Sequence, residues 1–189
     1  MSQIRSFIAM EMSLPVKTKI EDIQNKLKSS ASDVRWAKAD SIHLTLNFLG
    51  TIAEEQIPEI SDSIESCCTT SAPFTLTVNT LGAFPGDKNP RVIWIGTEDD
   101  TGTLVSLQQC VEKKLSTIGF KEEKRAFSPH LTLGRIKSPK GKRDLMQMVA
   151  EHKKCECGTL DVQEICLFKS DLKPGGAVHT KLKTFQLHE

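Results

Sequence analysis

The sequence predicts an α+β fold built as an internal duplication, with two lobes related by an approximate two-fold axis. Stretches with strand character are interleaved with stretches with helix character, and strands on either side of short turns favour antiparallel pairing. The tetrapeptide His-Leu-Thr-Leu occurs twice, at 43–46 and at 130–133, once in each half of the chain. Because no linker rich in Gly, Ser or Pro divides the halves, we expect residues 1–189 to form a single domain of two interleaved lobes.

The first half of the chain predicts strands and helices in turn. The predicted elements are a strand over 3–12, a helix over 14–30, a short strand and the first HLTL strand within 33–50, a helix over 53–68, and a strand over 74–84. The helix over 14–30 starts near Pro15 and repeats apolar residues at helical spacing. Gly50 is expected to end the HLTL strand, and Pro58 to interrupt or begin the helix over 53–68.

The second half predicts a similar mixture after the turn cluster at 85–90. A strand over 91–97 is followed by the clearest amphipathic helix of the chain, marked by Leu104, Leu107, Val111, Leu115 and Ile118. The second HLTL strand comes next, and then a helix over 142–153 in a stretch that Gly158 ends. Residues 160–172 and 177–187 are predicted to form a final strand pair around the turn at 173–176.

Length and hydropathy limit the class of protein. A chain of 189 residues can bury a substantial core. Its apolar runs, such as the one at 91–96, have the length of strands, which leaves no candidate for a transmembrane helix. The N-terminus has no basic head followed by a long apolar stretch, so we predict no signal peptide. We therefore expect a cytoplasmic protein with no membrane partner, and a monomer as the default state.

The six cysteines do not have the paired two-residue spacing of a zinc knuckle. We therefore predict reduced thiols. The formal net charge of +1 excludes a strongly basic nucleic-acid coat protein, although residues 121–144 carry eight basic and three acidic side chains around the second HLTL copy. This segment is either an anion-facing surface or a solvated lysine-rich loop.

Each HLTL copy predicts a strand with one apolar side and one chemically active side. In a strand, residues i and i+2 point to the same face. His43 and Thr45 are therefore expected on one face and Leu44 on the other, and the same holds for His130 and Thr132. If the two lobes are related by a two-fold axis, both imidazoles and both hydroxyls line one groove.

Two imidazoles and two hydroxyls suit the cleavage of a phosphodiester. Histidine titrates near neutral pH, so one ring takes a proton from water while the other gives a proton to the leaving oxygen. The hydroxyls donate hydrogen bonds to the phosphate oxygens as negative charge develops there. This chemistry requires no metal and no cofactor, and we expect none.

With these two H-x-T-x motifs, the sequence resembles the 2H phosphoesterases. The flanking residues are similar to the LigT-like branch, the RNA 2′,3′-cyclic phosphodiesterases also called ThpR. The likeness covers nearly the whole chain and includes "RSFIAME", "HLTLNFLG", "GAFP", "PRVIWIG", "SPHLTLGR" and "LFKSDLKPGG". It implies antiparallel sheets that face a central cleft, with helices on the outside. It also implies hydrolysis of a terminal 2′,3′-cyclic phosphate on RNA, or on a nucleotide, to a 2′-phosphate.

The resemblance also implies roles for individual residues. His43 would be the proton donor and His130 the proton acceptor, and Thr45 and Thr132 would hold the phosphate. Arg135 would be a further phosphate ligand, although strict alternation directs it away from the cleft. Some relatives join RNA ends through a 2′–5′ linkage, which is the same chemistry with a 5′-hydroxyl in place of water.

Other functions are compatible with the same two motifs. The alternatives are another 2H phosphodiesterase, acting on nucleoside or ADP-ribose cyclic phosphates or 2′–5′ oligonucleotides, a non-catalytic RNA-end-binding protein, and a zinc protein using both histidines. Phe48 could seat a base, but alternation places it on the core side. The remaining aromatic and histidine candidates are interpreted as structural or solvent-exposed: Trp36, Trp94, His152, His179 and His188.

Overall fold

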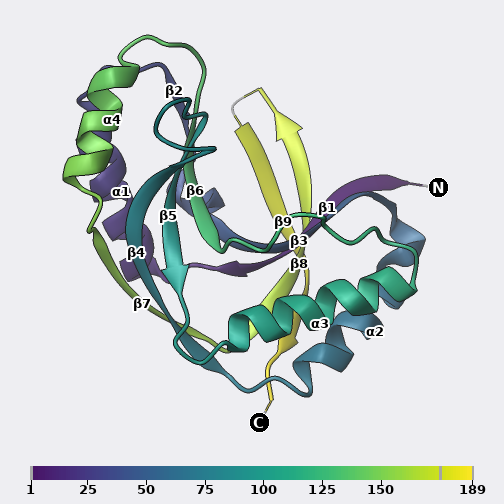
Figure 1. The fold of residues 1–189 in the computed structure, drawn as a ribbon. Coiled ribbons are helices and arrows are strands. Elements are labelled where there is room, and N and C mark those ends of the chain that lie inside the picture. Colours follow the sequence, from purple (N-terminus) through teal and green to yellow (C-terminus); the bar gives the residue numbers. More distant parts are fainter. Residues whose placement is uncertain (1, 175, 189) are drawn as a thin grey trace.

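The computed structural model describes residues 2–174 and 176–188, which form two antiparallel sheets with helices on their outer faces (Figure 1). Sheet A has the order β3 (His43–Ala53), β1 (Gln3–Glu11), β8 (Glu164–Lys173) and β9 (Gly176–Gln186). Sheet B has the order β2 (Val34–Trp36), β6 (His130–Ile136), β5 (Val92–Glu98), β4 (Phe74–Phe84) and β7 (Glu156–Val162). The chain passes repeatedly between the two sheets, so neither is built from one half of the sequence.

The helices cover the two sheets in pairs. They are α1 (Leu14–Lys28), α2 (Ile57–Cys68), α3 (Thr103–Thr117) and α4 (Lys142–Glu151), with short 3₁₀ turns η1 (Ala39–Ser41) and η2 (Glu54–Gln56). Helices α2 and α3 pack on each other and against sheet A, whereas α1 and α4 pack against sheet B (Figure 1). The predicted α+β class, with antiparallel sheets and outer helices, is confirmed.

The apolar side of each HLTL strand belongs to one continuous core that both sheets share with all four helices. Leu44, Leu46, Leu131 and Leu133 are at most 4% exposed. Each of these burials contributes about 1.5–3 kcal/mol, so the two motif strands are held firmly by their inner faces. Among the described residues, no helix is long and apolar enough to cross a membrane.

Strand β3 is longer than predicted and contains two β-bulges. Its pairing with β1 passes from Thr45 to Asn47 and from Phe48 to Gly50, which leaves one extra residue at each step. A bulge shifts the alternation of faces by one residue. Phe48 consequently lies opposite Phe7 and is 78% exposed. The prediction that Phe48 packs in the core is wrong, and so is the prediction that Gly50 ends the strand.

Two separate strands, β7 and β8, lie near the end of the chain where one strand over 160–172 is predicted. Residues 156–162 form β7 and pair with β4 in sheet B, whereas β8 begins at Glu164 and belongs to sheet A. Gly158 lies inside β7 with φ 98°, beside a shift of register, and does not end a helical stretch. The prediction of one continuous strand over 160–172 is therefore wrong, because this stretch contains the end of β7 and most of β8. The predicted pairing of the last two strands is confirmed by β8 and β9.

A disulfide joins the two helices that cover sheet A. Cys67 on α2 and Cys110 on α3 are bonded, with their Cα atoms 5.9 Å apart and a sequence separation of 43. The other four cysteines, at 68, 155, 157 and 166, are free thiols. The prediction of reduced thiols is therefore wrong for this pair. Sequence spacing did not indicate it because only the packing of α2 on α3 brings the two residues together.

Reduction of this disulfide is expected to lower the free energy of unfolding by about 2–4 kcal/mol, because the bond closes a loop of this length in the unfolded chain. Urea unfolding of the protein with and without dithiothreitol measures the difference. The Cys67→Ala/Cys110→Ala variant serves as the control and should not respond to the reductant. Peptide mapping that found both residues as free thiols under non-reducing conditions would contradict the assignment.

Candidate active site

His43 and His130 occupy equivalent positions, each as the first residue of its motif strand. In both, ring atom Nδ1 lies at hydrogen-bond distance from the backbone carbonyl two residues earlier. His43 bonds the carbonyl of Ser41 at 2.8 Å, and His130 bonds that of Ser128 at 2.6 Å. The repeat in the structure thus begins two residues before the tetrapeptide, at Ser-x-His-Leu-Thr-Leu, a pattern that the sequence contains at both places.

These two bonds determine which ring nitrogen is available for chemistry. A carbonyl oxygen only accepts hydrogen bonds, so Nδ1 of each ring carries the proton and donates. Nε2 is then the atom that takes up or releases a proton, and the bond fixes the orientation of the ring. Both histidines are therefore prepared in the same way to exchange a proton through Nε2.

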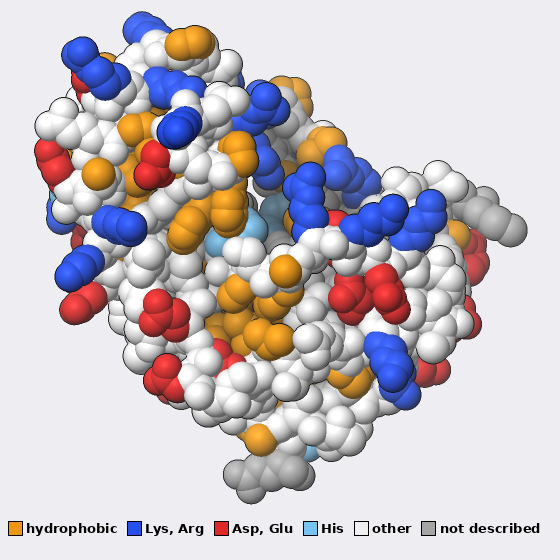
Figure 2. Space-filling view, in the orientation of Figure 1, with side chains coloured by type: hydrophobic (Ala, Val, Ile, Leu, Met, Phe, Trp, Pro, Cys, Tyr) orange, Lys and Arg blue, Asp and Glu red, His pale blue; other side chains and the backbone are white. Residues whose placement is uncertain are grey.

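The two motif strands contact each other although they belong to different sheets. Thr45 and Thr132 are half-buried, and in the described part of the chain neither hydroxyl has a hydrogen-bond partner within the protein. Figure 2 shows a hollow between the two lobes, with histidine side chains at its bottom and lysine and arginine side chains along one margin. The arrangement offers imidazole and hydroxyl groups together with nearby positive charge.

The ring of His43 is enclosed by aromatic side chains from three strands of sheet A. It stacks on Phe7 with 4.5 Å between ring centroids, and Phe168 continues the stack at 5.3 Å from Phe7. His179 on β9 meets His43 edge-on at 5.0 Å. His179, interpreted from the sequence as structural or solvent-exposed, is half-buried and contacts the ring of His43. Pairing of β9 with β8 brings it there, and a single sequence does not indicate such pairing.

This enclosure changes the acidity of His43. Burial, and secondarily the positive charge of a protonated His179, lowers its pKa from 6.5 to about 4, although the Ser41 carbonyl and Glu11 act in the opposite direction. Burial also lowers the pKa of His179. In the free protein at neutral pH, the His43 ring is therefore uncharged, and an anion placed beside it would stabilise the imidazolium.

The lowered pKa of His43 has a consequence for stability. The unfolded chain takes up this proton near pH 6.5, whereas the folded protein resists it down to about pH 4. The uncharged ring contributes about 2–3 kcal/mol to the free energy of unfolding. This contribution is present above pH 6.5 and is lost as the pH falls towards 4. We expect the wild type to lose this much more unfolding free energy between pH 7 and pH 4 than His43→Ala, measured by urea titration. Equal losses would contradict the lowered pKa.

His130 has a different aromatic neighbourhood, contributed by sheet B. Phe84 meets its ring edge-on at 4.9 Å and stacks on Trp94 at 5.0 Å. Trp94 is half-buried, pairs across the sheet with Thr132, and therefore shares its face. A Cβ at Gly82 would lie 2.4 Å from the indole, so only glycine lets the ring lie there. The prediction that Trp94 is a core residue is therefore wrong, whereas the same prediction for Trp36 is confirmed, because Trp36 packs against the core.

Arg135 is on the same face as Trp94 because β6 contains a bulge. The strand pairing passes from Thr132 to Gly134, and Arg135 then lies opposite Val92, which alternates with Trp94 along β5. Gln24 of α1 supports the irregular backbone by donating to the carbonyl of Leu133 at 2.9 Å. Strict alternation, which directs Arg135 to the core face, does not apply beyond this bulge, and the side chain is exposed.

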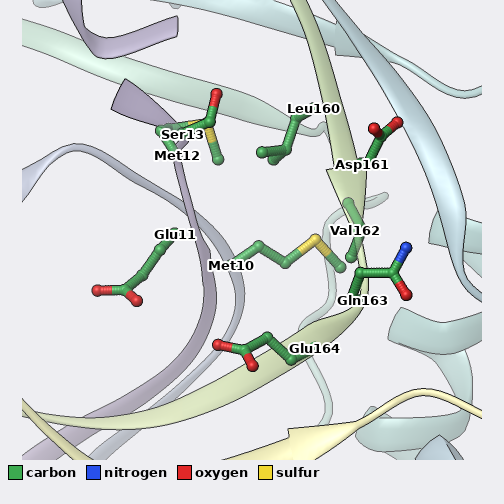
Figure 3. A pocket seen from close by; sticks show the side chains of 9 residues that line it. All are labelled: Met10, Glu11, Met12, Ser13, Leu160, Asp161, Val162, Gln163 and Glu164. Atoms are coloured by element: carbon green, nitrogen blue, oxygen red, sulfur yellow. The ribbon is translucent and has the colours of Figure 1, made fainter. Parts of the chain in front are cut away.

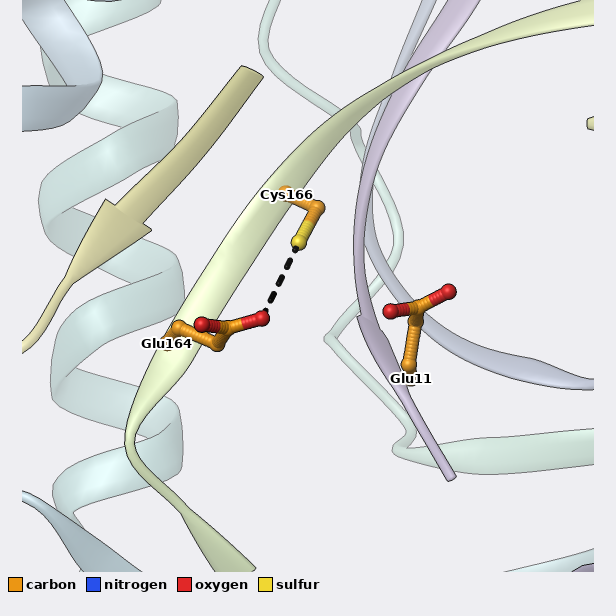
Figure 4. Close-up of side chains that lie close together, drawn as sticks. All are labelled: Glu11, Glu164 and Cys166. Carbon is orange, nitrogen blue, oxygen red and sulfur yellow. Dashed lines mark hydrogen bonds between the residues drawn. The ribbon is translucent and has the colours of Figure 1, made fainter. Parts of the chain in front are cut away.

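A second group of polar side chains lies on sheet A next to His43. Glu11, which pairs across the sheet with His43, comes together with Glu164 and Cys166 (Figure 4). Such a trio resembles a metal site, but the ammonium of Lys181 pairs with both carboxylates and supplies their counter-charge. Burial raises the pKa of the Cys166 thiol, which disfavours the thiolate that binds metals. The group is therefore best described as an ion-pair network.

A pocket of about 280 Å³ lies where the end of β1 meets the turn between β7 and β8 (Figure 3). Glu11, Asp161 and Glu164 are among its lining residues, and no residue of either HLTL copy is. Because the repeated motif does not line this pocket, the hollow that holds the histidine side chains is the better candidate for the site. In the described part of the chain, neither His43 nor His130 belongs to a group of three or more metal-ligating side chains, which gives the zinc alternative no support.

Comparison with known proteins agrees with this geometry. Residues 14–174 match the family model described as the 2′-5′ RNA ligase superfamily. An RNA 2′,3′-cyclic phosphodiesterase of Methanothermobacter thermautotrophicus is 30% identical over 98% of this chain and 100% of its own length. One of Archaeoglobus fulgidus is 31% identical over 97% of this chain and 100% of its own.

The fold also matches that of a solved structure. The crystal structure of E. coli LigT in its apo form superposes with a TM-score of 0.80 at 24% identity, covering 100% of both chains. The family model matches most of the chain, and two relatives are at least 30% identical over nearly their full length. This chain therefore belongs to the 2′-5′ RNA ligase superfamily of two-histidine phosphoesterases, as its repeated motif indicates.

Proposed function

We propose that this protein hydrolyses the 2′,3′-cyclic phosphodiester at the 3′ end of RNA to a 2′-phosphomonoester, without a metal ion. The observation that carries the proposal is the duplicated histidine geometry, in which two strands in contact each present an imidazole held through Nδ1. The names of the relatives from M. thermautotrophicus and A. fulgidus support the same substrate. A LigT crystal structure that contains 3′-AMP supports a nucleotide ligand.

In the proposed reaction, water attacks phosphorus in line with the bond to the ribose 3′ oxygen. His130 Nε2 takes a proton from the water as the new P–O bond forms. The P–O3′ bond breaks, and His43 Nε2 gives its proton to O3′, which leaves a 3′-hydroxyl and a 2′-phosphate. The two rings then exchange protons with solvent to restore the starting state. Replacing water by a 5′-hydroxyl gives a 2′–5′ linkage by the same steps.

The anionic substrate would supply the charge that His43 lacks in the free protein. A phosphodiester anion beside the ring stabilises the imidazolium and raises its pKa towards neutrality. Thr45 and Thr132 would donate hydrogen bonds to the non-bridging oxygens. Arg135, exposed on the face that carries Trp94 and Thr132, would approach the same phosphate or the next one along the RNA.

The direct test is to incubate the protein, in the presence of EDTA, with a short RNA that ends in a 2′,3′-cyclic phosphate. We expect a 2′-phosphate as the product, identified by chromatography against both isomers, at a rate that the chelator does not change. A 3′-phosphate would reverse the assignment of the leaving group. No turnover, with the RNA still bound, would favour a non-catalytic RNA-end-binding protein.

A bell-shaped dependence of rate on pH is expected, because one imidazole must be charged while the other is neutral. The value of kcat/KM reports the free enzyme, where the pKa of His43 is about 4, and kcat reports the complex, where the phosphate raises it. The apparent pKa assigned to His43 should therefore be higher in kcat than in kcat/KM. A rate that rises steadily through pH 9 would contradict the two-imidazole division of labour.

A further inference from the structure

Arg35 and Arg135 lie directly opposite each other where β2, the edge strand of sheet B, pairs with β6. Side chains of opposite residues in a sheet point to the same face, with their Cβ atoms about 4.5–5.5 Å apart. Both arginines are exposed, and the neighbour of Arg35 on β2, Trp36, packs against the core. The two guanidinium groups are therefore presented together on the face of sheet B that carries Thr132.

A close contact between β2 and Gly134 holds Arg35 in this position. A Cβ at Gly134 would lie 2.7 Å from the side chain of Val34 and 3.0 Å from that of Trp36. Only glycine therefore allows this strand of three residues to pair so closely with β6. The placement of Arg35 beside Arg135 is thus built into the pairing of the two strands.

This pair of positive charges has no counter-charge within the protein. In the part of the chain that the structure describes, neither guanidinium forms an ion pair, and the carboxylate of Asp33, which immediately precedes β2, reaches neither. Like charges directly opposite each other destabilise a sheet. An anion held between the two side chains would remove this repulsion, so the pair is suited to bind one.

The location of the pair relative to the reacting phosphate indicates which anion it binds. Thr132 and Arg135 share a face and are three residues apart in sequence, at most roughly 10 Å along the strand. Arg135 is thus placed between Thr132, which is proposed to hold the reacting phosphate, and Arg35, which is one strand farther away. A group bound by Arg35 is then a neighbour of the reacting phosphate and not the reacting phosphate itself.

An RNA end and a free nucleoside cyclic phosphate differ in the group next to the reacting phosphate. In RNA, the O5′ atom of the terminal ribose carries a phosphodiester, whereas in a nucleoside 2′,3′-cyclic phosphate it carries only a hydrogen. A guanidinium binds such a phosphate through two parallel N–H donors. Nucleoside cyclic phosphates, an alternative substrate class for the same two motifs, offer no charge at this position.

We propose that Arg35 binds the phosphodiester on the 5′ side of the terminal nucleotide, and that Arg135 lies between this phosphate and the reacting one. This inference rests on the proposed function and deepens it, since it makes RNA ends, and not nucleoside cyclic phosphates, the preferred substrate. Arg35 is a specificity-determining residue that takes no part in proton transfer.

The test compares two substrates that differ only in this phosphodiester. One is adenosine 2′,3′-cyclic phosphate, and the other carries in addition a methyl phosphodiester on O5′. For the wild type we expect a lower KM with the second compound. Arg35→Gln should raise that KM about tenfold or more with kcat little changed, because the lost hydrogen bonds are charge-assisted. The KM for adenosine 2′,3′-cyclic phosphate should stay the same.

Two further variants separate recognition of the phosphodiester from other effects. Arg35→Lys keeps the charge without the planar pair of donors and should recover part of the loss. Arg143→Gln removes the same charge from α4, on the other side of sheet B, and should leave both KM values unchanged. Thermal unfolding of Arg35→Gln should give a Tm no lower than that of the wild type, because the repulsion is relieved.

An equal rise of KM for both compounds in Arg35→Gln, or no rise for either, would overturn the inference. A rise that Arg143→Gln reproduces would overturn it as well, since the net charge of the protein would then account for the effect. Failure of the proposed function gives a different result, because the wild type would then cleave neither compound. In that case, calorimetric titration of both compounds into the wild type and Arg35→Gln still decides whether Arg35 binds the phosphodiester.

Discussion

His43→Ala and His130→Ala are each expected to lower kcat by about 10²–10⁴-fold on an RNA 2′,3′-cyclic phosphate, because each removes a positioned acid or base. Steady-state kinetics of the purified variants measure the loss. His188→Ala is the matched control, since this side chain is exposed near the C-terminus and should leave kcat unchanged. Full activity in either active-site variant would refute the two-histidine mechanism.

A change of leaving group separates the roles of the two histidines. An aryl phosphodiester with a nitrophenolate leaving group needs no proton on departure, so a general acid contributes little. His43→Ala should therefore be close to wild type on this substrate, whereas His130→Ala should remain impaired on both. If His130→Ala were close to wild type on this substrate and His43→Ala impaired, the two roles would be exchanged. The low pKa of His43 in the free protein, which keeps its ring neutral like that of a general base, makes this test informative.

Thr45→Val and Thr132→Val are expected to give the next largest losses, about 10²-fold or more in kcat each, because each removes a hydroxyl that is proposed to donate a hydrogen bond to the developing charge. Valine keeps the shape and the strand preference of threonine, so the fold should be retained. Thermal unfolding confirms that the variants are folded, and single-turnover kinetics give the rate of the chemical step.

Thr45→Ser and Thr132→Ser are the controls for the hydroxyl, since serine restores the donor without the methyl group. We expect them to recover most of the lost activity. A serine variant as impaired as the valine variant would indicate that the methyl group, through packing, accounts for the effect. In that case the phosphate ligands would have to be sought elsewhere, Arg135 first.

The sequence indicated the chemistry better than it indicated the directions of side chains. The repeated tetrapeptide predicted two strands and their buried leucines, because a period of two is readable over four residues. The class of reaction came from the chemistry of imidazole and hydroxyl groups and from the resemblance to the 2H phosphoesterases. Phe48 and Arg135 lie just beyond the tetrapeptides, and for both the alternation failed. A bulge has no sequence signature as clear as apolar periodicity, so a single sequence does not locate it.

Long-range pairing explains the other differences. His179 reaches His43 only because β9 pairs with β8, and Cys67 reaches Cys110 only because two helices pack together. Residues 156–162 are a strand through their pairing with β4, although their pattern is weak. These features depend on contacts between distant segments, which local propensity and spacing do not encode.

The bulges of β3 and β6 also determine how this chain tolerates changes of length. In most proteins a deletion is harmful in a strand because it shortens the strand, and harmless in a loop. Here the loss of the extra residue at a bulge, such as Leu49 in β3, would keep Phe48 opposite Phe7 and Gly50 opposite Ser6, so the ladder would become regular and the flanking side chains would keep their faces. A deletion elsewhere in these strands would exchange inside for outside on one side of it. Homologues that differ in length within these strands are therefore expected to gain or lose residues at the bulges.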